Sequence, residues 1–163
     1  MLKKILITFS LLILFSVNSN AAGSNDSTPK KVKSDYAKAV DLIKFAKKYE
    51  KKGKIEKANK RYEKAQKLLI KSNNKTPNNA NTLNYLGFTT RKLGDYEGGE
   101  KYYLQGLAIE PNHIGINEYL GELYVQTNRI EKAKERLAVL KNCNCEEFQE
   151  LELIIKTRGS KIY

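Results

Sequence analysis

Apolar residues recur along most of the chain at the three- and four-residue spacing that is typical of amphipathic helices. In the middle of the chain, Leu83, Leu86 and Thr90 fall at i, i+3 and i+7, so they lie on one face of a helix. Gly94 can adopt the left-handed conformation that often follows a helix, and Asp95 can accept hydrogen bonds from the first amides of the next helix. The pattern predicts two antiparallel helices joined by a tight turn.

This pattern occurs three times along the chain. In the middle copy it is marked by Leu83, Leu86-Gly87, Thr90, Gly94-Asp95-Tyr96, Gly99 and Tyr103. The corresponding positions of the next copy are Asn117, Leu120-Gly121, Tyr124, Asn128-Arg129-Ile130, Ala133 and Leu137. An earlier copy consists of Leu42, Phe45-Ala46, Tyr49, Gly53-Lys54-Ile55, Ala58 and Tyr62, and seven extra residues separate it from the middle copy. These extra residues lie within 66–76 and predict a second helix that is longer by up to two turns.

The repeat resembles that of tetratricopeptide repeat proteins. The middle copy carries the resemblance, with Leu83-x2-Leu86-Gly87-x2-Thr90, then Gly99-x3-Tyr103, then Pro111. Leu83 stands where an aromatic residue is usual and Gly99 where Ala is usual, and the first and third copies depart further from the signature. The resemblance covers about residues 36–141. It implies an all-α solenoid of about three helical hairpins, at 35–77, 78–111 and 112–142.

A further helix is predicted after the third hairpin, at about 143–158, with a short tail at 159–163. Its apolar stripe consists of Phe148, Leu151, Leu153, Ile154 and Ile155. Asn144 with Glu147 three residues later is typical of a helix start, and Arg158-Gly159 is expected to end the helix. Because a terminal repeat exposes one hydrophobic side, we expect this helix to cap the array.

Residues 1–21 have the features of a secretory signal peptide. Lys3 and Lys4 precede an apolar stretch at 5–17, and Ser19-Asn20-Ala21 has the small residues of a cleavage site. The apolar stretch would span roughly 20 Å as a helix, short of the ~30 Å hydrocarbon core, so an uncleaved anchor is the weaker alternative. We expect cleavage near Ala21, a flexible leader at 22–34, and a mature protein of bacterial type in the periplasm or outside the cell.

The chain carries 30 Lys and Arg against 18 Asp and Glu, a formal net charge of +12. Such a surface attracts anionic polymers, anionic lipid or acidic partners. The lysines are dense at 44–71, where Glu50, Glu56 and Glu63 alternate with them. This alternation favours a solvated, partly paired helix surface over a polyanion site. Because export argues against nucleic acid, no nucleic acid partner is expected.

The only cysteines, Cys143 and Cys145, form a candidate disulfide, since an even number of cysteines in an exported chain favours bonding. The ring closed by a Cys-x-Cys bridge is small, so reduced or intermolecular pairing stays an alternative, with redox function or metal binding as lesser ones. Two cysteines and one histidine do not make a closed zinc site, so no metal is expected. The single histidine, His113, follows Pro111-Asn112 in a loop between repeats and is interpreted as a surface residue.

The residue types needed for catalysis are sparse. A Ser/His/Asp or Cys/His set would have to be built around one histidine, and the sequence has no Gly-rich phosphate loop. The neighbouring acids Glu146 and Glu147 are typical of the first turn of a helix rather than of an acid/base pair. The sequence therefore predicts a binding protein without a cofactor, and not an enzyme.

The resemblance implies that the first helices of successive hairpins line a concave groove that receives a peptide or a helix. The residues that it places there as partner-binding candidates are Asn81, Asn84, Phe88, Arg91, Lys92, Lys47, Lys51, Glu118 and Glu122. We expect Asn84 to bind a peptide backbone and Arg91 with Lys92 to receive a carboxylate, the alternative being a solvated helix face.

These expectations favour an exported scaffold that binds a protein or peptide partner through the groove, in assembly or maintenance of the cell envelope. The alternative is a cationic module for anionic envelope polymer or lipid headgroups. Self-association through an exposed end of the array is a further expectation.

Overall fold

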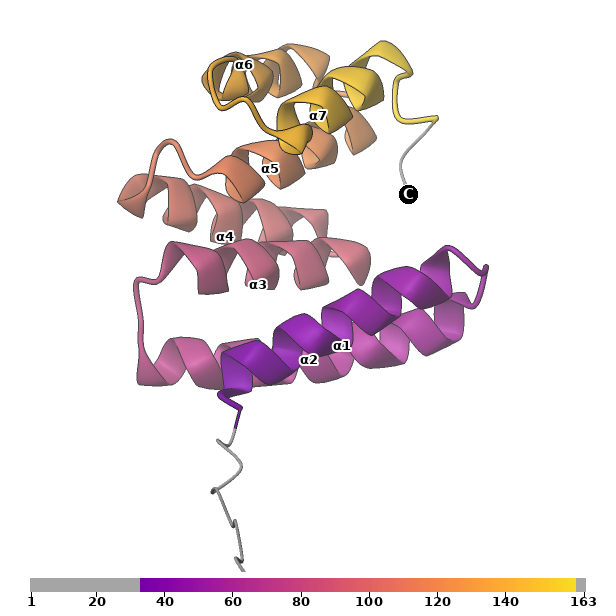
Figure 1. The fold of residues 1–163 in the computed structure, drawn as a ribbon, viewed down its shortest axis with the longest axis vertical. Coiled ribbons are helices and arrows are strands. Elements are labelled where there is room, and N and C mark those ends of the chain that lie inside the picture. The colour runs from indigo at the N-terminus through magenta and orange to yellow at the C-terminus, as the bar shows by residue number, and fades with distance from the viewer. Residues whose placement is uncertain (1–32, 161–163) are drawn as a thin grey trace, which may run out of the picture. The chain divides into compact units, whose positions relative to one another are not determined.

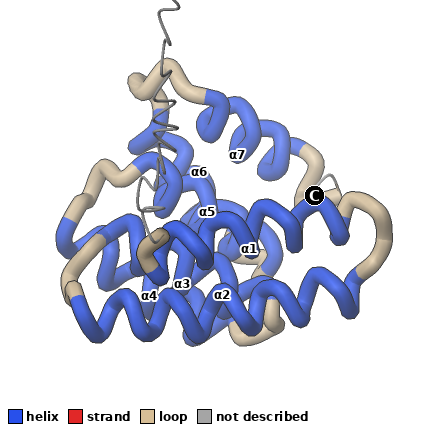
Figure 2. Tube along the Cα trace, turned by 60° about the horizontal axis from the view of Figure 1, so that its bottom comes forward, coloured by secondary structure: helices blue, strands red, loops and turns tan. Residues whose placement is uncertain are grey.

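The computed structural model describes residues 33–160, and this part of the chain is almost entirely helical (Figure 1, Figure 2). Its helices are α1 (Asp35–Glu50), α2 (Ile55–Lys75), α3 (Ala80–Lys92), α4 (Tyr96–Ile109), α5 (Ile114–Gln126), α6 (Ile130–Leu140) and α7 (Glu146–Lys156). The helices α1 and α2, α3 and α4, and α5 and α6 pack as successive hairpins, and α7 packs against α5 and α6. The predicted all-α repeat fold is confirmed. The predicted signal peptide, most of the predicted leader at 22–34 and the end of the predicted tail fall on residues 1–32 and 161–163. These residues lie outside the described part of the chain.

The turn inside each hairpin contains one residue with a left-handed backbone. Gly53, Gly94 and Asn128 stand at equivalent places with φ of 66°, 97° and 58°. The left-handed conformation suits glycine and is tolerated by asparagine, so these residue types occur at the turns. Asp95 then caps α4, since its carboxylate accepts a hydrogen bond from the Gly98 amide at 2.8 Å.

The second helix of the first hairpin is longer than its counterpart in the next one. The helix α2 has 21 residues and α4 has 14 residues, so the extra residues of the first copy lengthen the helix rather than the loop. The buried side chains of α2 are Ala58, Tyr62, Ala65 and Leu69. Their spacing of three and four residues is that of an apolar stripe on one helix face.

Glycines let the helices approach one another closely. A Cβ atom on Gly87 would lie 2.5 Å from a ring carbon of Tyr103, and one on Gly121 would lie 2.5 Å from a methyl carbon of Leu151. The two glycines hold the same position in successive repeats. The first glycine is covered by a side chain of α4, whereas the second is covered by a side chain of α7, so α7 supplies to α5 a contact like the one that α4 supplies to α3.

The start of α7 differs from its prediction. The residue before the first turn is Cys145, which makes no side-chain capping bond, and Asn144 has a φ of 51°. Because Asn144 adopts the left-handed conformation, it is not the N-cap that the sequence suggested. The helix ends before Arg158 and Gly159, which both have positive φ.

Among the described residues, no helix is both long enough and apolar enough to cross a bilayer.

Candidate functional site

One pocket is built from the first helices of all three hairpins together with the capping helix. Its volume is about 140 Å³, and its lining residues are Lys47, Glu50, Lys51, Phe88, Arg91, Lys92, Glu118, Tyr119, Glu122 and Glu150. We call it the central pocket. The basic side chains come from the α1 and α3 segments, and three of the four acids come from α5 and α7. We call the side of the pocket lined by α1 and α3 its basic pole and the side lined by α5 and α7 its acidic pole, and Arg91 and Glu122 meet between them.

Two aromatic rings lie among these charges. The ring centroids of Phe88 and Tyr119 are 4.9 Å apart, and Tyr62 packs against Phe88 with a centroid distance of 5.7 Å. The Lys47 ammonium lies 4.8 Å from the Phe88 centroid and donates a hydrogen bond of 3.0 Å to the Tyr119 hydroxyl. These contacts show that the rings accept a cation on their faces.

A buried ion pair joins α3 to α5 beside the rings. The guanidinium of Arg91 donates to the Glu122 carboxylate at 2.5 Å and to the Gln126 side-chain oxygen at 3.2 Å. Burial is the largest single effect and would lower the pKa of Arg91, but Glu122, Tyr103 and Tyr119 together outweigh it, so the pKa is raised. Both side chains are less than a tenth exposed, so removing either one would leave a buried charge without its partner.

A second ion pair joins α1 to α3 at the basic pole. The Lys92 ammonium lies 2.8 Å from one Glu50 oxygen, and the Tyr62 hydroxyl donates to the other at 2.8 Å. The carboxylate of Glu50 thus belongs to contacts inside the fold, and it links the first two hairpins.

The acidic pole holds a carboxyl group that retains its proton at neutral pH. Glu118 is 4% exposed, and burial, the nearby Glu122 charge and a hydrogen bond with Glu150 raise its pKa to about 9. The pKa of Lys47 is lowered because its ammonium is buried, although the carboxyl groups of the acidic pole oppose this shift. The single O–H of this neutral acid is donated to Glu150, so the proton joins α5 to α7.

The structure brings seven of the nine predicted partner-binding residues to the central pocket. These are Lys47, Lys51, Phe88, Arg91, Lys92, Glu118 and Glu122. The other two, Asn81 and Asn84, do not line it. Asn81 is exposed and accepts a hydrogen bond from the His113 ring at 3.2 Å, whereas Asn84 is only 6% exposed beside Gly115. For all nine residues, a role in partner binding stays a prediction.

Burial limits how two of these residues could act in the structure as it stands. Arg91 is 3% exposed and its guanidinium already binds Glu122, so it is not available to receive a carboxylate from a partner. Asn84 is packed inside the fold, so its amide is not accessible to a bound peptide. At the basic pole, Lys51 is exposed and Lys92 is partly exposed, so these two residues remain accessible to a ligand.

Three lining residues lie outside the nine predicted ones. One is Glu50, which makes contacts inside the fold, and the other two are Tyr119 and Glu150. Tyr119 stands one repeat after Tyr85, so the repeat could have drawn attention to it. Glu150 could not have been found in this way, because it reaches the pocket only through the docking of α7 on α5.

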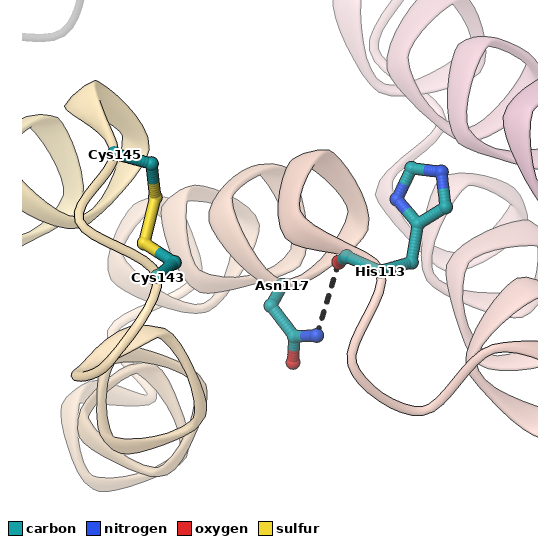
Figure 3. The surroundings of a disulfide bond; sticks show 4 residues. All are labelled: His113, Asn117, Cys143 and Cys145. Carbon is teal, nitrogen blue, oxygen red and sulfur yellow. Dashed lines mark hydrogen bonds between the residues drawn. A yellow bond between two sulfur atoms is a disulfide. The ribbon is translucent and has the colours of Figure 1, made fainter.

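The cysteines and the histidine lie at helix starts (Figure 3). Cys143 and Cys145 are joined by a disulfide, with their Cα atoms 5.2 Å apart, directly before α7. His113 caps α5, since its Nδ1 atom accepts a hydrogen bond from the Ile116 amide at 3.1 Å and its carbonyl accepts one from the Asn117 side chain at 3.1 Å. In the part of the chain that the structure describes, no three His, Cys, Asp or Glu side chains gather as a metal site would require.

Comparisons with known proteins agree with this architecture. The tetratricopeptide repeat family matches residues 91–151. The uncharacterized protein ycf37 of Guillardia theta is 36% identical over 56 residues, which cover 34% of this chain and 32% of that protein. The match therefore spans about a third of the length of this curated relative.

Solved structures of the Yersinia enterocolitica type III secretion translocator chaperone SycD have a similar fold. One is 16% identical with a TM-score of 0.53 and covers 75% of this chain and 83% of SycD. Another, an alternative dimer, is 19% identical with a TM-score of 0.53 and covers 79% and 92% of the two chains. The helical hairpins and these structures show an all-α repeat fold like that of tetratricopeptide repeat proteins, and the family match covers residues 91–151 of it.

Proposed function

We propose that this chain is a scaffold that binds a segment of a partner protein at the central pocket. The observation that carries the proposal is the polarity of the pocket, which runs from cations at the α1 and α3 segments to carboxyl groups on α5 and α7. Charges of both signs that converge around aromatic rings suit a peptide that carries an acidic and a basic side chain. SycD, a chaperone with the same fold, supports the use of such a fold for binding another protein.

The basic pole suits an acidic side chain of the partner. Lys51 is exposed at the C-terminal end of α1, and Lys92 keeps 15% of its side chain exposed. A carboxylate placed between these amines would make charge-assisted hydrogen bonds, which are stronger than neutral ones.

The acidic pole suits a basic side chain of the partner. Glu118 and Glu150 share a hydrogen bond between α5 and α7, and Glu122 adds a third carboxyl group. A cation that approaches them would favour loss of the Glu118 proton, since a nearby positive charge stabilises a carboxylate.

The proposed place of action is the cell envelope of a bacterium, after export and cleavage near Ala21. The signal-peptide features at 1–21 support this part of the proposal. Fractionation of cells that express the chain, followed by mass measurement of its N-terminus, tests it. A chain found only in the cytosol with its first residues intact would contradict export.

The pocket itself is tested with a displayed library of random peptides. Peptides selected on the wild-type chain are measured by fluorescence anisotropy against the variant Lys51→Gln/Glu150→Gln, which neutralises one side chain at each pole. We expect affinities weaker by roughly 100-fold or more for the variant, because it removes two hydrogen bonds to charged groups, each of which contributes roughly 1.5–3 kcal/mol.

A matched control for this variant is Lys101→Gln/Glu97→Gln, which makes the same charge change at two exposed positions of α4. It is expected to bind the selected peptides like the wild type. Peptides that bind all three proteins equally would show that the central pocket is not the binding site.

A further inference from the structure

The positive charge of the described chain is concentrated in its first hairpin. Residues 35–75 contain fourteen Lys and Arg against five Asp and Glu, a net charge of +9. Residues 76–160 contain ten basic and twelve acidic residues, a net charge of −2. Of the fourteen basic residues, only Lys47 and Lys51 line the central pocket, and neither is in α2. The positive charge of α2 is therefore not explained by the pocket.

Five lysines of α2 form a continuous stripe along the helix. They are Lys57, Lys60, Lys64, Lys67 and Lys71, and we call them the lysine stripe. Their spacing of three and four residues places them on one side of the helix, opposite its buried residues, and all five are exposed. The stripe runs for about 21 Å, and its last two members lie in the part of α2 that the extra residues lengthen.

These lysines have few acidic partners inside the fold. Lys71 lies 3.4 Å from Asp35, and none of the other four makes an ion pair within the described residues. The alternation of Glu and Lys predicted partial pairing along this stretch, but Glu50 contacts Lys92 and Tyr62 instead. Most of the charge of the stripe is thus left for solvent or for an anionic surface.

An exposed aromatic side chain lies next to the stripe. Phe45 of α1 is 51% exposed, and its ring lies 5.6 Å from the Lys48 ammonium and 5.9 Å from the Arg61 guanidinium. Arg61 lies about one helical turn from both Lys57 and Lys64, so it connects the ring to the stripe.

The exposure of Phe45 is specific to the first repeat. Its equivalents in the second and third repeats, Leu86 and Leu120, are 1% and 0% exposed. Leu86 belongs to a core cluster that includes side chains of the first hairpin. Because no described hairpin precedes α1, Phe45 lacks this cover and faces outward beside the cations.

We propose that this face of the first hairpin docks on an anionic lipid bilayer. The lysine stripe lies over the phosphate-bearing headgroups, and Phe45 enters the interfacial layer between Lys48 and Arg61. Lysines with an exposed aromatic residue are the combination that surface-bound helices use on anionic membranes. The first hairpin lies at the end of the array away from α7, and no stripe lysine lines the central pocket, so docking leaves the pocket for a protein partner (Figure 1).

The test is co-sedimentation of the chain, as cells produce it, with vesicles of phosphatidylglycerol and phosphatidylcholine. The variant Lys60→Gln/Lys64→Gln/Lys67→Gln removes three stripe charges that make no ion pair within the described residues. We expect its partition to fall roughly 100-fold, because each lysine near an anionic surface contributes about fivefold. The control Lys101→Gln/Lys132→Gln/Lys141→Gln removes three exposed lysines outside the first hairpin and is expected to keep most of the binding.

A second variant separates a bilayer from a soluble polyanion. Phe45→Ala is expected to weaken vesicle binding several-fold while leaving binding to heparin unchanged, whereas Leu104→Ala, at a similarly exposed position of α4, changes neither. A wild-type chain that does not sediment, or equal sedimentation of the stripe variant and the wild type, would overturn the proposal. Vesicle binding that needs the stripe but is unchanged in Phe45→Ala would overturn the insertion of the Phe45 ring and leave a purely electrostatic contact. Circular dichroism of each variant checks that the helices are retained.

Discussion

The repeat array is covered by a helix at its C-terminal end, whereas its N-terminal hairpin presents lysines and a half-exposed phenylalanine. At the C-terminal end, Leu151 and Ile154 of α7 are 0% and 1% exposed, and Leu151 packs closely on Gly121. At the N-terminal end, the outer side chain Phe45 is 51% exposed. One end is therefore stabilised by apolar burial, whereas the other presents positive charge and an exposed ring.

The largest expected difference between the two ends is in the stability of the fold. Leu151→Ala should lower the free energy of unfolding by about 2–5 kcal/mol, because it removes a fully buried side chain and leaves a cavity. Phe45→Ala should lower it by about 1 kcal/mol or less, since half of the ring is exposed. Urea denaturation followed by circular dichroism measures both. Equal losses would show that the N-terminal face is as much a part of the core as α7.

The second prediction concerns the hydrogen bond that ties α7 to α5. The pKa of Glu118 is raised to about 9, so the folded chain holds this proton more tightly than the unfolded chain does. The stability contributed by this proton is fully present below the ordinary pKa of Glu and is lost as pH rises toward 9. Over this range the free energy of unfolding should fall by up to about 1.4 kcal/mol per pH unit. Urea denaturation at several pH values measures the slope.

Glu118→Gln is the matched variant for this titration. The amide keeps the shape of the neutral acid but cannot ionise, so it should flatten the fall in stability between about pH 5 and 9. The stripe variant of α2 should keep the wild-type slope, because its lysines lie outside the central pocket. An unchanged slope in Glu118→Gln would assign the pH dependence to another group.

Local sequence patterns predicted the helices well and the pairing of side chains less well. The turns at Gly53, Gly94 and Asn128 could be predicted because each depends on the conformational preference of one residue. The burial of Arg91 could not, because its partner Glu122 lies on another hairpin. The contact of Glu118 with Glu150 likewise depends on how the capping helix docks on α5.

The smallest expected effect concerns the lysine stripe and the stability of α2. Like charges three or four residues apart on a helix destabilise it by about 0.2–0.5 kcal/mol per pair at low salt. The variant Lys60→Gln/Lys64→Gln/Lys67→Gln should therefore melt at a slightly higher temperature than the wild type, and added salt should reduce the difference. Differential scanning fluorimetry at low and high salt measures this. If the variant is more stable but binds vesicles less well than the wild type, the presence of the lysines is explained by binding. A variant less stable than the wild type would show instead that the lysines support the fold.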